Sequence, residues 1–296
     1  MVGPVSALKR LAKRSPQLVA LKRKWQWRLH IAKDWWGTRV WRKTHEVRTP
    51  FGFKLSSGFH PAYEQMRAGT FEPEETRVIL SELEKADRFV DVGANLGYYT
   101  CLALQQGRPV VAFEPQPQNL ACLYNNLIAN GWEDKAEVFP LALSEKPGLL
   151  SLFGASGPSA SLLPNWAGYS SRHQQTVPVS TLDAVLAGRF EGERIFIKVD
   201  VEGAEHQVLK GAIKTLARTP RPSWLMEVCL QEFHPDGANP DFQRIFDLFW
   251  SNGYRACTAT GERREVSRED VRSWVAAGSS GAGTFNYLFV SADHQP

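Results

Sequence analysis

FVDVGANLGYYT, residues 89–100, joins two apolar segments through a turn that contains Gly93 and Gly97. The segment 88–92 predicts a short buried strand, and the segment 97–106 predicts a helix. A strand, a glycine-containing turn and a helix together are typical of the opening of an α/β nucleotide-binding unit. Which nucleotide the turn binds must be decided from other residues.

The pattern around this unit alternates between strands and helices. Strands are predicted at 88–92, 109–113, 136–140, 194–199 and 223–228, and helices at 97–106, 117–130, 203–217 and 240–252. Such alternation predicts a parallel sheet covered by helices on both faces. Two last strands, 254–258 and 284–290, have no long helix predicted between them, so we expect an antiparallel pair at the sheet edge. The predicted fold class is therefore α/β, with a mostly parallel, seven-stranded sheet.

The domain organisation predicted from composition is a body at 46–296 preceded by an arm at 1–45. Within the body, residues 144–180 interrupt the alternation and are rich in Gly, Ser and Pro. They predict an inserted hairpin and loop. Since ligands bind beyond the carboxyl ends of parallel strands, an insertion there is well placed to form a lid or an acceptor pocket.

The arm carries an excess of positive charge. Residues 1–43 hold 12 Lys or Arg and one acid, while the whole chain has a net charge of +4, so the body is net negative. A helical stripe is expected along one face of the arm, formed by Leu18, Leu21, Trp25, Leu29, Ala32 and Trp36. The stripe packs on the body or on a second subunit, or else lies on an anionic membrane. Nucleic acid is the least favoured partner.

Composition excludes several other classes of protein. The four cysteines are scattered, so no zinc spacing or disulfide framework is predicted. The sequence contains no run of 18 apolar residues, so no membrane span is predicted. The basic N-terminus lacks the apolar segment of a signal peptide. We therefore expect a cytoplasmic protein, with the inner face of the cytoplasmic membrane as a second location.

The glycine turn departs from the dinucleotide fingerprint G-x-G-x-x-G. Counting from Gly93, Asn95 and Tyr98 occupy the second and third glycine positions. Those glycines let the backbone approach a pyrophosphate, so their loss favours a ligand without one. Glu114 ends the next strand, where an acid can accept both hydrogen bonds of a ribose diol.

S-adenosylmethionine meets these requirements because it has a ribose, an amino-acid tail and no phosphate. Asp91 can pair with its ammonium group, and the backbone of the turn can approach the tail. The turn residues that we assign to this cofactor are Gly93, Ala94, Asn95 and Gly97. As alternatives, Asp91 and Asn95 could only cap the helix, and Glu114 could be a solvated strand-end acid.

Three segments in this order resemble the FkbM-type methyltransferases. They are FVDVGANLGYYT (89–100), VVAFEPQPQNLACLYNNLIANG (110–131) and IFIKVDVEGAEHQVLKGA (195–212), with GTFEPEE (69–75) and STLDAVL (180–186) beside them. The resemblance covers about residues 46 to 290. It implies a Rossmann-like methyltransferase fold that uses S-adenosylmethionine, and methylation of hydroxyl groups, often on sugars or natural products. The basic arm lies outside it.

The third segment offers candidates for catalysis. Asp200 follows the strand 194–199, next to the glycine-turn strand, so we also expect it to bind the cofactor near the methyl-bearing sulfonium. Glu202 lies in the turn behind it. Methyl transfer to a hydroxyl needs a base, which contributes about 10²–10⁴-fold to the rate. We favour Asp200 or Glu202 as that base. Glu205 and His206 are alternatives that could instead belong to the first turn of a helix.

Other residues are assigned on weaker grounds. Lys198, a charge inside an apolar strand, is expected to pair with Asp200 or Glu227. Two strand-end acids could bind Mg²⁺, but without a clear third ligand we predict no metal. The remaining candidates are Glu72 for the amino-acid tail, Leu141 and Ala142 beside the adenine, and Ser159, Ser161, Glu232 and His234 toward the acceptor.

The preferred function is S-adenosylmethionine-dependent O-methylation of a sugar, glycolipid or natural product. One alternative is an NAD-linked oxidoreductase, which the failed fingerprint disfavours. Another is a non-catalytic protein that binds S-adenosylmethionine or a membrane. A small-molecule or glycan acceptor is the expected partner, and a homo-oligomer is compatible with the sequence.

Overall fold

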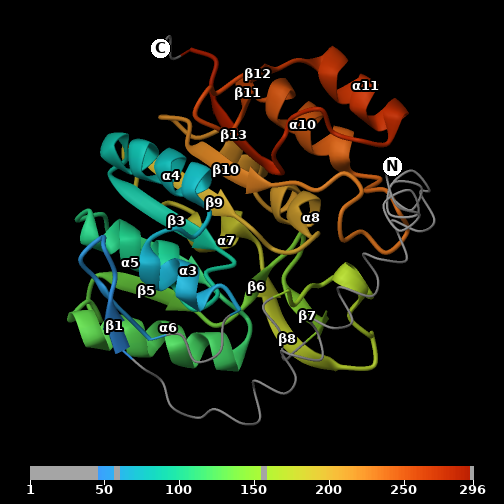
Figure 1. The fold of residues 1–296 in the computed structure, drawn as a ribbon. Coiled ribbons are helices and arrows are strands. Elements are labelled where there is room, and N and C mark those ends of the chain that lie inside the picture. Colours follow the sequence, from blue (N-terminus) through green and yellow to red (C-terminus); the bar gives the residue numbers. More distant parts are fainter. Residues whose placement is uncertain (1–45, 57–60, 155–158, 294–296) are drawn as a thin grey trace, which may run out of the picture.

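The computed structural model describes residues 46–56, 61–154 and 159–293. The arm at 1–45, with its predicted helix, lies outside the described residues. The chain forms a central sheet with helices on both sides and a small second sheet beside it (Figure 1).

The central sheet has eight strands in the order β12-β11-β13-β10-β9-β3-β4-β5. Their bounds are β3 Arg88–Val92, β4 Val110–Phe113, β5 Ala136–Phe139, β9 Ile195–Val199, β10 Ser223–Glu227, β11 Tyr254–Thr258, β12 Glu265–Val266 and β13 Asn286–Ser291. The five strands from β10 to β5 are parallel. The predicted fold class, a Rossmann-like α/β fold with a mostly parallel sheet, is confirmed.

The C-terminal part of the chain differs from the prediction in three respects: the place of β13, a missed helix and a missed strand, which makes the sheet eight-stranded and not seven-stranded. β11 and β13 do pair antiparallel, but β13 lies between β10 and β11 instead of at the edge. A ten-residue helix, α11 (Arg268–Ala277), and the short strand β12 precede β13, and both were missed. The sequence held a signal for α11, because Ser267 and Asp270 form a capping box at its start. An interior position suits β13, whose Tyr287, Leu288 and Phe289 are fully buried.

The helices cover both faces of the sheet. Their bounds are α3 Tyr63–Ala68, α4 Pro73–Lys85, α5 Tyr98–Gln105, α6 Pro117–Asn130, α7 Leu182–Leu186, α8 Glu205–Lys210, α9 Ile213–Leu216 and α10 Phe242–Ser251. Successive residues of a strand enter opposite apolar cores. In β9, for example, Phe196 belongs to one core, and Ile195 and Ile197 belong to the other. Burial on both faces explains why the parallel strands are apolar throughout.

The helix predicted at 203–217 is two shorter helices, α8 and α9. They meet at Gly211, where an added Cβ would lie 2.2 Å from the backbone oxygen of Ser144. The chain entering the inserted segment thus passes directly over this glycine. The break is a tertiary effect. Helical patterns lie on both sides of it in the sequence, and Gly211 is the only residue between them that hints at it.

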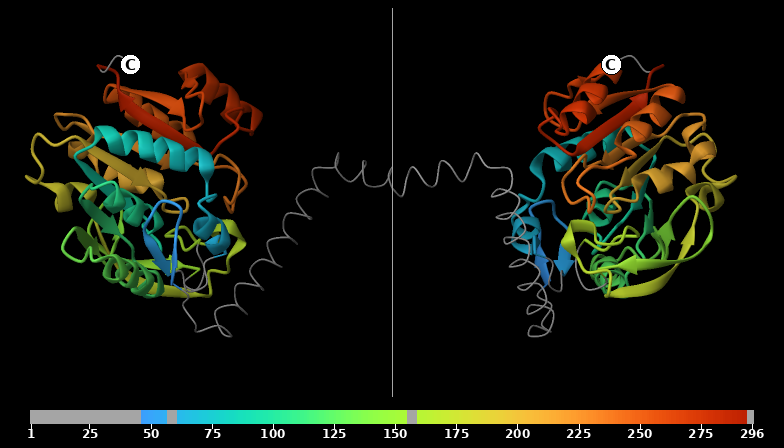
Figure 2. Two further views of the ribbon diagram at one scale, coloured as in Figure 1. Left: turned by 60° about the vertical axis from the view of Figure 1, so that its left-hand side comes forward. Right: turned by 90° about the vertical axis from the view of Figure 1, so that its right-hand side faces the viewer.

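The inserted segment builds a sheet of its own. Its strands are β6 (Ala142–Leu143), β7 (Gly148–Phe153) and β8 (Gln174–Ser180), in the order β6-β8-β7. β7 and β8 form an antiparallel hairpin, and the 3₁₀ turn Trp166–Gly168 lies between them. Figures 1 and 2 show this small sheet beside the main sheet, below α8 in the view of Figure 1.

Three further features complete the description of the fold. A short hairpin, β1 (Glu46–Arg48) and β2 (Lys54–Ser56), lies against α6 through hydrogen bonds to Asn126 and Asn130. All four cysteines are free thiols. Across the three described ranges, no helix combines the length and apolarity that crossing a membrane requires.

Candidate active site

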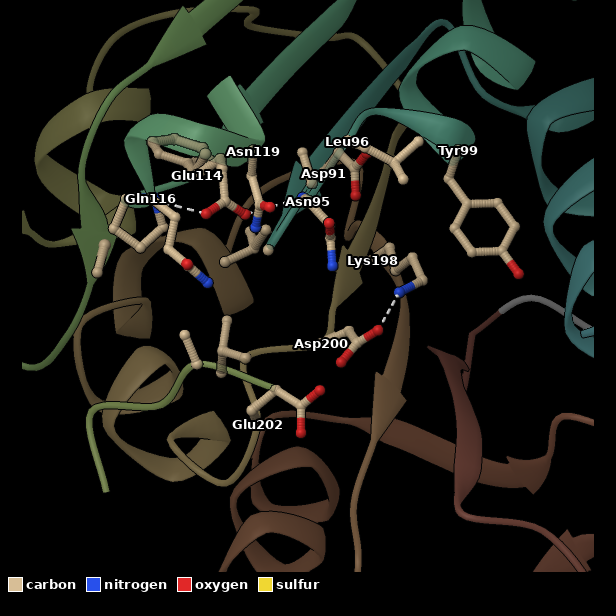
Figure 3. Close-up of a pocket in the computed structure, with 18 of the residues that line it drawn as sticks. Asp91, Asn95, Leu96, Tyr99, Glu114, Gln116, Asn119, Lys198, Asp200 and Glu202 are labelled. Carbon is tan, nitrogen blue, oxygen red and sulfur yellow. Dashed lines mark hydrogen bonds and ion pairs between the residues drawn. The ribbon is translucent and has the colours of Figure 1, made fainter. Parts of the chain in front are cut away.

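A pocket of about 270 Å³ opens at the carboxyl ends of the central parallel strands. Residues after β3, β4, β9 and β10 line it, together with residues of the inserted segment. This is the place where open α/β sheets bind ligands. Figure 3 shows its polar side chains converging, with Asp91, Asn95 and Glu114 on one side and Lys198, Asp200 and Glu202 on the other.

The glycines of the turn are explained by neighbouring protein atoms. Gly93 has a φ of +87°, and a Cβ there would lie 1.9 Å from the backbone oxygen of Asp200. A Cβ on Gly97, with a φ of +86°, would lie 2.3 Å from Cδ1 of Leu123. The chain bends as it does so that the segment after β9 and the helix α6 can pack against it. The steric demand for glycine at these positions therefore comes from the fold itself.

Glu114 fixes the turn from the end of β4. Its two carboxyl oxygens accept hydrogen bonds from the backbone N–H groups of Asn95 and Gln116, both at 2.8 Å. The residue is 4% exposed, so the alternative of a solvated strand-end acid is wrong. Burial raises the pKa of Glu114 to about 7, although both hydrogen bonds oppose the rise. Each carboxyl oxygen has a second lone pair that can accept from a ligand hydroxyl.

Asp91 lies at the floor of the pocket. It is 1% exposed and accepts a hydrogen bond of 2.6 Å from the hydroxyl of Thr100 on α5. Burial raises the pKa of Asp91, and the nearby Lys198 partly opposes this. The carboxyl group is therefore placed and oriented in a site of low dielectric constant.

Lys198 is the centre of a cluster of acids. Its Nζ lies 2.8 Å from Oδ2 of Asp200 and 3.6 Å from Oε1 of Glu75. The first of the two predicted partners, Asp200, is thus the one found in an ion pair. Burial by itself would lower the pKa of Lys198, but the surrounding carboxylates, Asp200 foremost, raise it well above its usual value. The lysine stays charged and holds Asp200 at the pocket edge.

Glu72 enters the pocket from the segment before α4. It is the residue preceding the helix, with a φ of +40°, but its side chain does not cap the helix. The carboxyl group instead accepts a 2.8 Å hydrogen bond from the hydroxyl of Tyr99. The carboxyl group of Glu72 is therefore turned toward Tyr99 and not toward the start of the helix. Burial raises the pKa of Glu72 despite the charge of Lys198.

Glu202 faces the pocket from the turn after β9. Its φ of +58° is unusual for a residue with a side chain. The indole Nε1 of Trp166 donates a 2.6 Å hydrogen bond to its carboxyl group, and the hydroxyl of Ser161 donates to its backbone oxygen. Burial, reinforced by the charge of Asp200, raises the pKa of Glu202 to about 8. Two residues of the inserted segment thus hold this acid in place.

Glu205 and His206 have structural roles. Glu205 starts α8 and accepts a 2.8 Å hydrogen bond from the backbone N–H of Gly203. His206 lies 3.1 Å from Asp241, measured between Nδ1 and Oδ2. Neither residue lines the pocket. The alternative that placed them in the first turn of a helix is correct, which leaves Asp200 and Glu202 as candidate bases.

The weaker candidates likewise divide into residues that line the pocket and residues that do not. Leu141 and Ala142 line the pocket, as does Ser159, whereas Ser161 is used by the backbone of Glu202. Of the loop QEFHP, Phe233 lines the pocket in place of Glu232 and His234. A metal-binding group of three or more His, Cys, Asp or Glu side chains does not occur within residues 46–56, 61–154 and 159–293.

Sequence reasoning missed several lining residues. The most informative are Tyr98, Gln116, Asn119 and Phe233. Gln116 and Asn119 follow Glu114 in EPQPQN, at the start of α6, so their nearness to the strand end was a usable signal. Phe233 gave none, because only the tertiary fold brings its loop to the pocket.

The residues present fit S-adenosylmethionine. Asn95 Oδ1 and Tyr98 Oη line the pocket and have no hydrogen-bond partner among the residues that the structure describes. Acids surround them, which suits a ligand carrying ammonium and sulfonium charges. The apolar side chains of Phe113, Leu141 and Ala142 offer a surface for an adenine ring. The pocket is therefore consistent with S-adenosylmethionine as cofactor.

Comparisons with known proteins point to one family. The model of the methyltransferase FkbM domain matches residues 91–256, more than half of the chain. Hexuronic acid methyltransferase AglP of Haloferax volcanii is 30% identical over 147 residues, which are 49% of this chain and 58% of that protein. The match thus spans less than two thirds of the relative.

Solved structures with similar folds are more distant. Methyltransferase FkbM from Methylobacillus flagellatus KT has a TM-score of 0.37 and 15% identity, covering 69% of this chain and 43% of that one. The O-methyltransferase from Bacillus cereus in complex with SAH has a TM-score of 0.42 and 13% identity, covering 77% and 84%. At such scores these likenesses add nothing to the fold assignment, which rests on strand order and the family match.

Proposed function

The chain belongs to the FkbM methyltransferase family, and on that premise we propose that it methylates a hydroxyl oxygen with S-adenosylmethionine as donor. One observation carries the proposal. A single pocket joins the glycine turn and Glu114 on one side to Asp200 and Glu202 on the other. The first set suits the binding of a nucleoside, and the second suits the removal of a proton.

The cofactor-binding side is assigned residue by residue. Glu114 accepts hydrogen bonds from the ribose diol, and Asp91 and Glu72 pair with the ammonium group of the tail. The backbone of Gly93, Ala94, Asn95 and Gly97 approaches the tail, while Leu141 and Ala142 flank the adenine. These groups are held before any ligand arrives, because Glu114, Asp91 and Glu72 are each hydrogen-bonded within the protein. Such preorganisation limits the entropy lost on binding.

The catalytic side is assigned to Asp200 and Glu202. When bound, S-adenosylmethionine supplies an electrophilic methyl group. The new O–C bond forms as the C–S bond breaks, and the hydroxyl proton passes to a carboxylate of the protein. Glu202 is the better proton acceptor because its pKa of about 8 lies near neutral pH. Asp200, held by Lys198, orients the acceptor and stabilises the positive charge of the sulfonium group.

The acceptor is proposed to be a sugar, a glycolipid or a natural product with a free hydroxyl. The Haloferax relative is described as a hexuronic acid methyltransferase, which favours a carbohydrate. The inserted segment, which supplies Ser159, Ala160 and Leu162 to the pocket wall, is the part of the chain best placed to select the acceptor.

Calorimetry with the full chain tests the cofactor assignment. We expect S-adenosylmethionine and S-adenosylhomocysteine to bind and NAD not to bind. Binding of NAD alone would favour the oxidoreductase alternative and sink the proposal. Transfer is then tested by incubating the protein and labelled S-adenosylmethionine with glycan and lipid extracts. Cofactor binding without labelling of any extract component would favour the non-catalytic alternative.

A further inference from the structure

Trp166, in the inserted segment, is buried beside the turn that carries Glu202. The side chain is 3% exposed and lies against Gly203, where an added Cβ would be 2.6 Å from the indole ring. Gly203 follows Glu202 directly, so the glycine lets the indole come close to the backbone of the turn. Phe233 and His234 contact the ring from the loop after β10. The indole is therefore fixed on several sides.

The polar edge of the indole points at one atom. Nε1 donates its hydrogen bond to Oε2 of Glu202 over 2.6 Å, and Ser159 also hydrogen-bonds this carboxyl group. The hydroxyl of Ser161 meanwhile holds the backbone oxygen of Glu202. These contacts decide where the carboxyl group of Glu202 lies. They also hold the residue in a left-handed backbone conformation, which is rare for a residue with a side chain.

The charges that face Glu202 are mainly negative. They are the carboxyl groups of Asp200 after β9, Glu205 on α8 and Glu227 at the end of β10. The thiol of Cys229 is a further titratable neighbour. Lys198 is the cation among the described lining residues, and it is already bound to Asp200 and Glu75. Glu202 thus has no cation of its own within this pocket.

We propose that Trp166 is a positioning residue that holds Glu202 as proton acceptor, and that Glu202 gives up its own proton when the cationic cofactor enters the pocket. The inference rests on the proposed function, because it assumes that S-adenosylmethionine binds here. Buried carboxyl groups lose protons readily when a positive charge arrives nearby, since the low dielectric constant strengthens the attraction. With Glu202 protonated in the empty site, the base forms only when a methyl donor is present.

The proton balance of the proposal is complete. On cofactor binding, the proton of the Glu202 carboxyl group leaves to solvent, and the indole N–H of Trp166 stabilises the carboxylate. During transfer, the hydroxyl proton of the acceptor passes to that carboxylate while the C–S bond breaks. The product, S-adenosylhomocysteine, has a neutral sulfur, so Glu202 retains the proton it has received.

Calorimetry in two buffers of different ionisation enthalpy measures the released proton without any acceptor. Near neutral pH we expect roughly one proton released per S-adenosylmethionine bound and close to none for S-adenosylhomocysteine. In Glu202→Gln the release should vanish while binding heat remains. In Trp166→Phe, which keeps an aromatic ring but lacks the N–H, the pH range of proton release should move upward. Trp250→Phe, on α10, is the matched control and should behave as the wild type.

The outcomes separate this inference from the proposed function. If neither cofactor form binds, the proposed function fails, and this inference with it. If S-adenosylmethionine binds but no proton leaves, or Glu202→Gln releases as many protons as the wild type, this inference alone fails. A Trp166→Phe protein identical to the wild type would reduce Trp166 to a packing residue.

Nuclear magnetic resonance of the tryptophan indoles tests the pair directly in the cofactor-free protein. The Trp166 signal is the one missing from Trp166→Phe. We expect its chemical shift to change with pH in the wild type and to stay constant in Glu202→Gln. A signal that does not respond to pH in the wild type, or responds equally in both proteins, would overturn the pairing.

Discussion

On the β3–β4 side of the pocket, acids are held by backbone and hydroxyl groups, whereas on the β9–β10 side they face one another. Glu114 accepts from two backbone N–H groups, and Asp91 accepts from Thr100. On the β9–β10 side, in contrast, the charge of Asp200 helps to raise the pKa values of Glu202 and Glu227, and Asp200 itself is paired with Lys198. On the first side the acids are held in fixed orientations. On the second side the acids form a cluster whose protonation depends on the charge of the bound ligand.

This difference predicts separate roles for the two sides of the pocket, one in cofactor binding and the other in chemistry. A site fixed by local backbone contacts binds a ligand with little rearrangement, because its groups are already oriented. A site of coupled carboxyl groups changes protonation when a cation or a proton arrives. Binding of cofactor should therefore depend mainly on the first side and chemistry on the second. Substitutions that affect one side and spare the other test the division.

The largest effect is expected where the two sides touch. Gly93→Ala places a Cβ 1.9 Å from the backbone oxygen of Asp200, at a φ of +87°. Since neither backbone can move freely, we expect a loss of at least about 4 kcal/mol in the free energy of unfolding, or no folded protein. The control Gly107→Ala has a similar φ of +74° but no atom within 4 Å. Denaturant unfolding of both variants measures the difference, and equal losses would contradict the steric account.

Asp200→Asn is expected to act on chemistry. The change keeps the size of the side chain and removes the charge that pairs with Lys198. Because Asp200 orients the acceptor, turnover should fall by about 10²-fold, while the affinity for S-adenosylmethionine changes much less. Initial rates with an acceptor found in extracts, together with calorimetry, measure both quantities. Asp241→Asn, which removes the partner of His206 outside the pocket, is the control. Normal turnover in Asp200→Asn would leave Glu202 as the base without help.

Glu114→Ala should give the opposite result. Hydrogen bonds from ribose hydroxyls to a carboxylate are worth about 1.5–3 kcal/mol each, so affinity for S-adenosylmethionine should fall by at least about tenfold. Because the backbone N–H groups of Asn95 and Gln116 also lose their acceptor, Glu114→Gln serves as a milder variant. Glu137→Ala, an acid on the neighbouring strand β5 that is paired with Arg189, is the control. Unchanged affinity in calorimetry would disprove the ribose assignment.

The smallest effect concerns the pH dependence of stability. The pKa of Glu202 is raised to about 8 by burial and by Asp200, so the folded state keeps a proton that the unfolded state has lost above about pH 5. The stability associated with this proton is present at low pH and is lost as the pH rises through about 8. Between about pH 5.5 and 7, the wild type should lose about 1.4 kcal/mol more per pH unit than Glu202→Gln.

Thermal and denaturant unfolding across this pH range checks the slope. Glu114 and Glu205, whose pKa values burial raises to about 7, contribute to both proteins and cancel in the comparison. Parallel stability curves for the wild type and Glu202→Gln would show that Glu202 titrates as an ordinary exposed acid.

The sequence by itself determined the strand-turn-helix unit, the parallel part of the sheet and the acids at the ends of β3, β4 and β9. These features were predictable because strand burial, glycine turns and strand ends are local patterns with fixed periods. The same holds for the uneven charge of the chain, with its basic residues concentrated in 1–43.

Tertiary structure alone decided the contacts between distant segments. The insertion of β13 between two strands, the packing of Trp166 on Gly203 and the approach of Asp200 to Gly93 join residues far apart in the chain. The second partner of Lys198, Glu75, comes from α4 and meets the lysine only because this helix packs near β9. Such contacts follow from the packing of whole elements, and no period or spacing within the sequence encodes which side chains will meet.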